Sequence, residues 1–151
     1  MDIKSNTIDH PQVRALLQQH VDEMIANSPP GHAYVLDLNA LQMPTITFLT
    51  VWNAETLLGC GALSDLGNHS GEVKSMRTDT DHLGKGVART LLDEIVRLAK
   101  ARGYHRLSLE TGRGPIFDRA ITLYEKYGFQ SGPAFGDYKD GDFNQFFHLD
   151  L

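Results

Sequence analysis

A glycine-rich turn, LGKGVA at residues 83–88, holds the residues of this chain that are best suited to bind a charged ligand. A helix that begins directly after such a turn presents unpaired backbone N–H groups and the positive end of its dipole, which together attract an anion. Gly84 and Gly86 lack the Cβ atoms that would keep a diphosphate at a distance, and Ala88 is small. The turn therefore predicts an anion site, although turns of this kind also serve simply to begin a helix.

Two familiar phosphate loops do not fit this turn. Its glycines are two residues apart with no third glycine in the pattern, which excludes the dinucleotide fingerprint, and no Gly-Lys-Ser/Thr is present, which excludes the Walker-type loop. A phosphate-binding domain of another kind stays open on these residues alone.

The turn lies between segments that differ in periodicity. Residues that are β-branched and aromatic, or that alternate, predict strands over 45–52, 56–63, 72–78, 106–111 and 143–149. Apolar residues at helical spacing predict helices from Pro11 to before Ser28, from Gly86 to Gly103 and from Pro115 to Gly128. Residues 64–71 carry turn formers, and residues 32–44 fit either a short helix or an irregular segment. This order predicts one domain over residues 1–151, an α/β fold with helices on both faces of a mixed sheet.

Length and composition indicate a small globular domain. The chain has 151 residues, 41% of them hydrophobic and 22% charged, and can bury one core without disulfides. No N-terminal apolar segment follows a basic cluster and no stretch is long enough to cross a bilayer, which predicts a cytoplasmic protein without a membrane partner. The net charge of -5 argues against nucleic acid as a partner.

Cysteine and histidine usage gives no sign of a metal site. The single cysteine, Cys60, lies between two glycines in an apolar stretch, so we expect a buried thiol. The seven histidines are scattered, with no helical i, i+4 pair and no cysteine partners. We therefore expect no bound metal.

A second motif, LYEKYGF at residues 123–129, stands at the end of the last predicted helix. The order of strand, LGKGVA turn, long helix, strand and LYEKYGF helix resembles the GNAT superfamily of N-acetyltransferases. Residues 71–78 (GEVKSMRT) and 108–112 (SLETG) are similar to a small bacterial subgroup that carries GE(I/V)KSMRT before the turn and SLETG after the central helix.

The resemblance implies a fold and an activity. The fold is a mostly antiparallel sheet of about six to seven strands with a splayed centre and helices on both faces. The activity is transfer of an acetyl group from acetyl-CoA, as co-substrate, to a primary amine of a small molecule or a protein, by direct attack in a ternary complex. A non-catalytic acyl-CoA-binding regulatory protein is the alternative, and a homodimer is compatible with the family.

The resemblance also implies a set of cofactor-binding residues. They are Met76, Arg77, Thr78, Leu83, Gly84, Lys85, Gly86, Val87, Ala88, Arg89 and Tyr124. Two positions depart from the family pattern. Leu83 stands where the family usually has Arg or Gln, which leaves the backbone, helped by Lys85 or Arg89, to hold the pyrophosphate. Phe117 stands where many members have an Asn that contacts the pantetheine arm.

Three residues take catalytic roles by the same resemblance: the Met76 amide polarises the thioester carbonyl, Glu72 acts as base and Tyr124 hydrogen-bonds the departing sulfur. A base is useful because a Lys-like amine of pKa about 10.4 is neutral only about 0.04% of the time at pH 7. Glu110 is the other candidate base. The alternatives are a solvated Glu72 and a merely packed Tyr124.

The acceptor pocket is expected between the first helix, the 28–44 segment and the tail. Polar candidates there are His32, Tyr34, Tyr138 and Asn144. The residues do not specify the acceptor.

Overall fold

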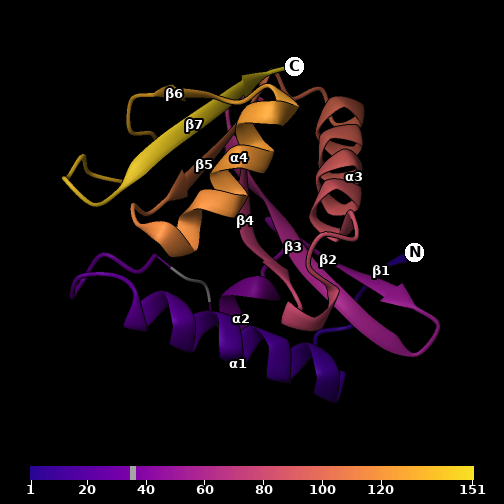
Figure 1. Cartoon of the computed structure of the whole chain (residues 1–151). Coiled ribbons are helices and arrows are strands. Elements are labelled where there is room, and N and C mark those ends of the chain that lie inside the picture. The colour runs from indigo at the N-terminus through magenta and orange to yellow at the C-terminus, as the bar shows by residue number, and fades with distance from the viewer. Residues whose placement is uncertain (35–36) are drawn as a thin grey trace.

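In a computed structural model that describes residues 1–34 and 37–151, one sheet runs through the molecule (Figure 1). Its order among the described residues is β1-β2-β3-β4-β5-β7-β6. The strands are β1 (Asp2–Ser5), β2 (Ile46–Asn53), β3 (Thr56–Gly67), β4 (Ser70–Thr78), β5 (Arg106–Thr111), β6 (Gln130–Gly132) and β7 (Gln145–Asp150). All neighbours pair antiparallel except β4 and β5, which are parallel. The predicted mixed, mostly antiparallel α/β sheet is confirmed.

Helices cover both faces of this sheet (Figure 1). The helices α1 (Pro11–Ala26) and α2 (Leu38–Leu41) lie on one face, and α3 (Val87–Ala101) and α4 (Asp118–Tyr127) lie on the other. Short 3₁₀ turns, Thr80–His82 and Pro115–Phe117, precede α3 and α4.

Two hydrophobic clusters hold the layers together. Leu91 and Ile95 of α3 pack with Leu63 of β3 in the larger cluster, and Leu16 of α1 packs with Ala62 of β3 in the smaller one. Successive side chains of a strand point to opposite faces, so β3 contributes to both clusters. The sheet is thus buried on both sides at its centre.

The parallel pairing between β4 and β5 is short. It joins Ser70 to Arg106, Gly71 to Leu107 and Glu72 to Ser108, and no further β4–β5 pair exists among the described residues. Beyond Glu72 the two strands separate, which opens the centre of the sheet. This splay creates the space for the site described below.

A bulge bends β4 where the splay begins. The register with β3 passes from Ala62–Lys74 to Cys60–Arg77, and Ser75 adopts a left-handed conformation with φ of +56°. Gly61 permits this close approach, because a Cβ there would lie 2.5 Å from the Met76 sulfur. A bulge of this kind re-aims the groups that follow it in the strand.

Several expected boundaries differ from the observed ones. The turn expected over residues 64–71 is mostly strand, since β3 runs to Gly67 and β4 starts at Ser70, leaving a tight hairpin. Strands β1 and β6 are short edge strands that the pattern did not predict. Within the open 32–44 segment, residues 35–36 lie outside the described residues, and α2 occupies part of the rest.

Within the described residues, no helix combines the length and the apolar character needed to cross a membrane.

Candidate active site

A cleft of about 580 Å³ opens where β4 and β5 separate. It is lined by α1, the 28–34 segment, β4, the turn before α3, β5 and the start of α4. One end meets the glycine turn of residues 83–86 and the first turn of α3, and we refer to it as the turn end. The other end meets a polar cluster, defined as His32, Glu72, Lys74, Glu110, Tyr138 and Asn144. Strand β4 runs between the two ends.

The turn end is built from backbone. Gly84 and Gly86 have φ of +74° and +82°, and a Cβ at either position would meet no protein atom within 4 Å. The first backbone bond of the helix type runs from the Thr90 N–H to the Gly86 carbonyl, so the N–H groups of residues 87–89 have no partner within α3. Left-handed glycines, open space and free N–H groups at a helix N-terminus together form an anion cradle.

The side chains near this cradle contribute unequally. Leu83 is 43% exposed and offers no polar contact. Lys85 Nζ lies 3.0 Å from His82 Nδ1 at the surface. Arg89 points along its helix, where Nε bonds Asp93 at 3.2 Å and the guanidinium stacks 4.6 Å from the Tyr127 ring centroid. Of the two basic residues predicted to help hold the pyrophosphate, Lys85 therefore has fewer competing contacts than Arg89.

Arg119 is a cation at the cleft that the sequence analysis did not single out. It lines the cleft from α4, is exposed, and forms no ion pair with any described residue. The sequence could have indicated Arg119 by its position two residues after Phe117, because the start of α4 borders the cleft.

Tyr124 lines the cleft from the opposite wall to β4. Its ring is buried against Phe129, with centroids 5.7 Å apart. Burial raises the pKa of the Tyr124 hydroxyl, so the phenol stays protonated. No hydrogen bond joins this hydroxyl to another residue in the described ranges, which leaves it free to donate into the cleft.

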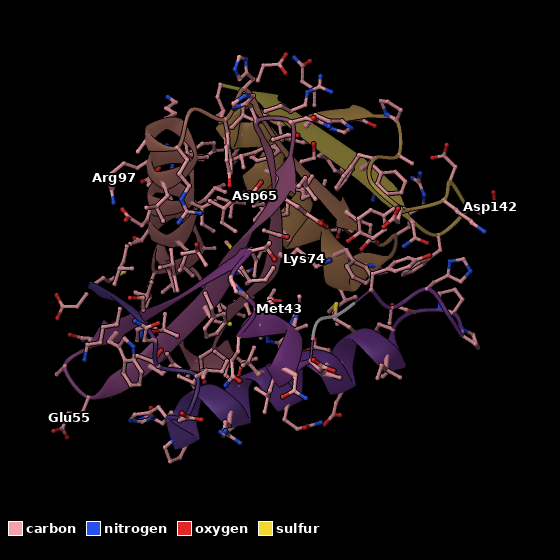
Figure 2. All side chains as sticks on the ribbon, turned by 180° about the vertical axis from the view of Figure 1, so that it is seen from behind. Met43, Glu55, Asp65, Lys74, Arg97 and Asp142 are labelled. Carbon is pink, nitrogen blue, oxygen red and sulfur yellow. The ribbon has the colours of Figure 1, made fainter. Side chains whose placement is uncertain are left out.

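One half of the polar cluster is a closed triad of Glu72, Lys74 and Tyr138. Tyr138 Oη donates to Glu72 Oε2 at 2.5 Å, and Lys74 Nζ donates to Tyr138 Oη at 2.6 Å and to Glu72 Oε2 at 3.3 Å. Glu72 is only 5% exposed, which contradicts a solvated strand end. Burial, and then the Glu72 carboxylate, raise the pKa of Tyr138, which therefore acts as a donor. The Lys74 side chain is only 11% exposed and lies near the middle of the view in Figure 2, whereas Glu55, Arg97 and Asp142 reach outward at its margins.

The other half of the cluster is an open chain that ends on Glu110. Asn144 Nδ2 donates to Glu110 Oε2 at 2.6 Å, and Asn144 Oδ1 lies 2.8 Å from His32 Nδ1. An amide oxygen only accepts, so His32 Nδ1 carries the proton. Burial is the main cause that raises the pKa of Glu110, against a smaller lowering by Asn144. No cationic nitrogen of the described residues lies within 4 Å of this carboxylate.

A second ion pair lies between β4 and α1. The Arg77 guanidinium contacts the Glu23 carboxylate, and His20 lies beside them on the cleft wall. Burial and the nearby Arg77 lower the pKa of His20 to about 4, so its ring is neutral at pH 7. The Arg77 side chain is thus held by α1, which leaves only the Arg77 backbone for the cofactor contact predicted at this position.

Aromatic side chains form the remaining wall of the polar end. The Phe117 and Phe143 ring centroids lie 5.7 Å apart, and Gly112 makes room for them because a Cβ there would lie 2.4 Å from Phe143 Cζ. Tyr34 is 39% exposed and packs edge-on against Tyr138 at 5.0 Å. Phe117, which stands where many family members have an Asn, therefore forms part of an apolar wall of the cleft.

The model of the acetyltransferase (GNAT) family matches residues 13–129 of this chain. The chain belongs to the GNAT acetyltransferase family. The unrelated phosphate-binding domain left open by the turn is thereby excluded, and the expected kinship is confirmed.

Relatives extend this likeness over nearly the whole chain. YsnE, an uncharacterized N-acetyltransferase of Bacillus subtilis, is 46% identical over 138 residues, which cover 91% of each chain. YedL, an uncharacterized N-acetyltransferase of Escherichia coli, is 42% identical over 149 residues, covering 99% of this chain and 94% of YedL. A solved structure of a candidate acyl-CoA N-acyltransferase from Klebsiella pneumoniae is 27% identical, with a TM-score of 0.82 and coverage of 99% and 97%.

Most residues predicted for this GNAT site line one cleft. Among them are Glu72, Met76, Arg77, Thr78, Leu83, Gly84, Gly86, Val87, Ala88, Arg89, Glu110 and Tyr124, whereas Lys85 lies on the exposed turn without lining it. The acceptor candidates His32 and Tyr34 line it too, and Tyr138 and Asn144 join it through hydrogen bonds.

Sequence reasoning missed Lys74 and Glu23, because Lys74 contacts Tyr138 and Glu23 contacts Arg77, and both of these partners lie far away in the chain. No group of three or more His, Cys, Asp or Glu side chains that suits a metal ion occurs in the described parts of this GNAT protein.

Proposed function

We propose that this GNAT protein transfers an acetyl group from acetyl-CoA to a primary amine, by direct attack within a ternary complex. One observation carries the proposal: a single cleft joins an anion cradle, an unpaired strand edge and the half-buried carboxylate of Glu110, which has no cation partner among the described residues. These three features suit the diphosphate, the thioester arm and the attacking amine, in that order along β4.

The cofactor fits the turn end by its chemistry. The N–H groups of Val87, Ala88 and Arg89 and the open space at Gly84 and Gly86 suit a diphosphate. We propose Arg119, outside the predicted set, as an added cation for a phosphate group.

The pantetheine arm suits the free edge of β4. From Val73 onward this edge has no β5 partner, so its backbone can pair with an extended ligand as a further strand would. Thr78 would pair with the amides of the arm, and the Met76 amide would donate to the thioester carbonyl oxygen. Loss of one such donor typically raises the barrier by about 3 to 4 kcal/mol.

The contacts favour Glu110 over Glu72 as the base. Glu72 Oε2 already accepts from Tyr138 and Lys74, so this carboxylate holds the triad together. Glu110 has one oxygen held by Asn144, lies on the cleft and has a pKa raised by burial, as suits a group that takes a proton. Glu110 would accept the ammonium proton directly or through a water.

The reaction then needs one new bond and one broken bond. The neutral amine nitrogen attacks the carbonyl carbon, the C–N bond forms, and the C–S bond breaks with its electron pair leaving on sulfur. Tyr124 would donate a hydrogen bond to that sulfur. Because burial raises the pKa of Tyr124, this donation stabilises the thiolate without full proton transfer from the phenol. The nitrogen, cationic after the attack, loses its second proton to solvent to give the amide, and the thiolate takes a proton from Glu110 or from solvent.

Two measurements test the proposal together. Acetyl-CoA at about a hundred times its dissociation constant should add about 2.7 kcal/mol to the free energy of unfolding, which raises the melting temperature by roughly 5 to 10 °C. A panel of primary amines should then release free CoA from acetyl-CoA. A melting shift without turnover of any amine would favour the non-catalytic acyl-CoA-binding alternative, and no shift at millimolar acetyl-CoA would contradict both readings.

A further inference from the structure

When the charged side chains along this part of the cleft are paired, one carboxylate has no cationic partner among the described residues. Lys74 is paired with Glu72 at 3.3 Å, and Arg77 is paired with Glu23 of α1. Glu110 has no such partner among the described residues. The three carboxylates and two cations therefore sum to one negative charge, and that charge lies where an acceptor amine must arrive.

The remaining basic groups of the cleft do not alter this balance. His20 is neutral because burial and Arg77 lower its pKa to about 4. Arg89 lines the cleft from the start of α3, where Asp93 and Tyr127 engage its side chain, and Arg119 lines it from α4, where the proposed function assigns it to a CoA phosphate. With Lys74 paired to Glu72 and Arg119 assigned to CoA, a negatively charged group beside the acceptor amine would meet Glu110 and no other unpaired Lys or Arg among the described residues that line the cleft.

The walls beside Glu110 are aromatic and apolar. Phe143 packs against Phe117 across Gly112, Tyr34 contributes a half-exposed ring from the 28–34 segment, and Met24 lines the cleft from α1. Flat apolar surfaces of this kind contact an aromatic ring favourably at low entropic cost.

Building on the proposed acetyl transfer, we propose that the acceptor is an arylalkylamine: a primary amine on a short chain from an aromatic ring, with no carboxylate next to the amine. Its ammonium group meets Glu110, which takes the proton, and its ring lies between Tyr34 and Phe143. An α-amino acid with the same ring brings a carboxylate for which the described residues beside Glu110 hold no unpaired cation. A diamine brings a second ammonium group to an end that has one unpaired carboxylate.

The test compares kcat/KM for four amines with saturating acetyl-CoA: 2-phenylethylamine, phenylalanine, n-butylamine and 1,4-diaminobutane. Phenylethylamine should exceed phenylalanine by about 100-fold or more, since like charges at a closed site are strongly disfavoured. It should exceed butylamine by about 10- to 100-fold, from burial of the ring. The diamine should not exceed butylamine.

Two substitutions of Tyr34 test where the aromatic ring of the acceptor binds. Tyr34→Ala should lower kcat/KM for phenylethylamine by about 2- to 10-fold and leave that for butylamine nearly unchanged, whereas Tyr34→Phe should retain the preference. Tyr34 is 39% exposed, so both variants should fold, which a melting curve checks.

Equal or better turnover of phenylalanine, butylamine or the diamine would overturn the inference and leave acetyl transfer to amines standing. Absence of turnover with every amine, despite firm acetyl-CoA binding, would overturn the proposed function and this inference with it.

Discussion

The two ends of the cleft are built in different ways. The turn end comes from one continuous stretch, residues 83–89, and its useful groups are backbone N–H groups and space at glycines. The polar end comes from segments far apart in the chain, and its useful groups are side chains held by hydrogen bonds such as Asn144 to Glu110 and Tyr138 to Glu72. A backbone site tolerates much change in side chains, whereas a network of side chains depends on each member.

Because of this difference, the turn end can be shared by a whole family, whereas the polar end can distinguish the acceptor of one member. Any acyl-CoA brings the same diphosphate to the turn, and even Leu83 is compatible with that role because the backbone does the binding. In the proposed function the polar cluster meets the acceptor, so its particular pairs would decide which amine reacts. A variant of Gly86 tests the turn end, and variants of Glu110 and Glu72 test the polar end.

The largest effect should follow from Gly86→Asp, which places bulk and a negative charge in the anion cradle. We expect no detectable CoA binding by calorimetry. Gly67→Asp is the matched control, because Gly67 has a similar φ of +79°, an equally open Cβ position and a place in the distant β3–β4 hairpin. Retained CoA binding by Gly86→Asp would show that the diphosphate lies elsewhere.

Glu110→Gln should lower kcat by about 100- to 10,000-fold, the usual contribution of a positioned base. In the wild type, kcat should fall as the pH decreases through the pKa of Glu110, which burial holds above the ordinary glutamate value, because the protonated acid cannot accept a proton. The variant should lose this acid limb of the pH profile.

Glu72→Gln provides the comparison for that variant, since Glu72 is buried in the same cluster. We expect Glu72→Gln to lower the melting temperature more and kcat less than Glu110→Gln does. A larger loss of kcat in Glu72→Gln than in Glu110→Gln would indicate that Glu72 is the base.

Tyr124→Phe should lower kcat by about 10- to 100-fold, as expected for one hydrogen bond to a developing negative charge. CoA affinity should stay within a small factor of the wild type, because the ring still fills its buried position. Equal kcat values in the two proteins, measured by CoA release, would remove Tyr124 from the mechanism.

The smallest effect is expected for Arg119→Ala, which should weaken CoA binding by about 2- to 5-fold, as an exposed ion pair does. Arg89→Ala should weaken it less, because the Arg89 side chain is engaged with Asp93 and Tyr127. Calorimetric titrations with CoA at low and moderate salt would compare the two, and a larger loss for Arg89→Ala would contradict this ranking.

Sequence reasoning succeeded where the structure follows the order of the chain. The turn, the strand before it and the Tyr124 helix are contiguous motifs, so the fold class and the anion cradle were predictable. Strands β1 and β6 were not, since each has only three or four residues and forms by pairing with a distant strand.

The polar end shows the limit of such reasoning more clearly. The sequence offered His32, Tyr138 and Asn144 as separate candidates, but nothing in their spacing showed that Asn144 would hold Glu110 or that Tyr138 would hold Glu72. Those contacts join residues 34 and 66 positions apart, and only the folded sheet brings them together. Lys74 and Glu72 share a face because they lie two positions apart on β4, but the contact of Lys74 with Tyr138 joins residues 64 positions apart and needs the folded sheet.

The most direct measurement is the stoichiometry of a single reaction mixture of protein, acetyl-CoA and 2-phenylethylamine, followed by mass spectrometry of small molecules and of the intact protein. The proposed direct attack predicts equal amounts of free CoA and N-acetylated amine, with no acetylated protein at any time. Free CoA without acetylated amine, or an acetylated protein that precedes the product, would contradict it.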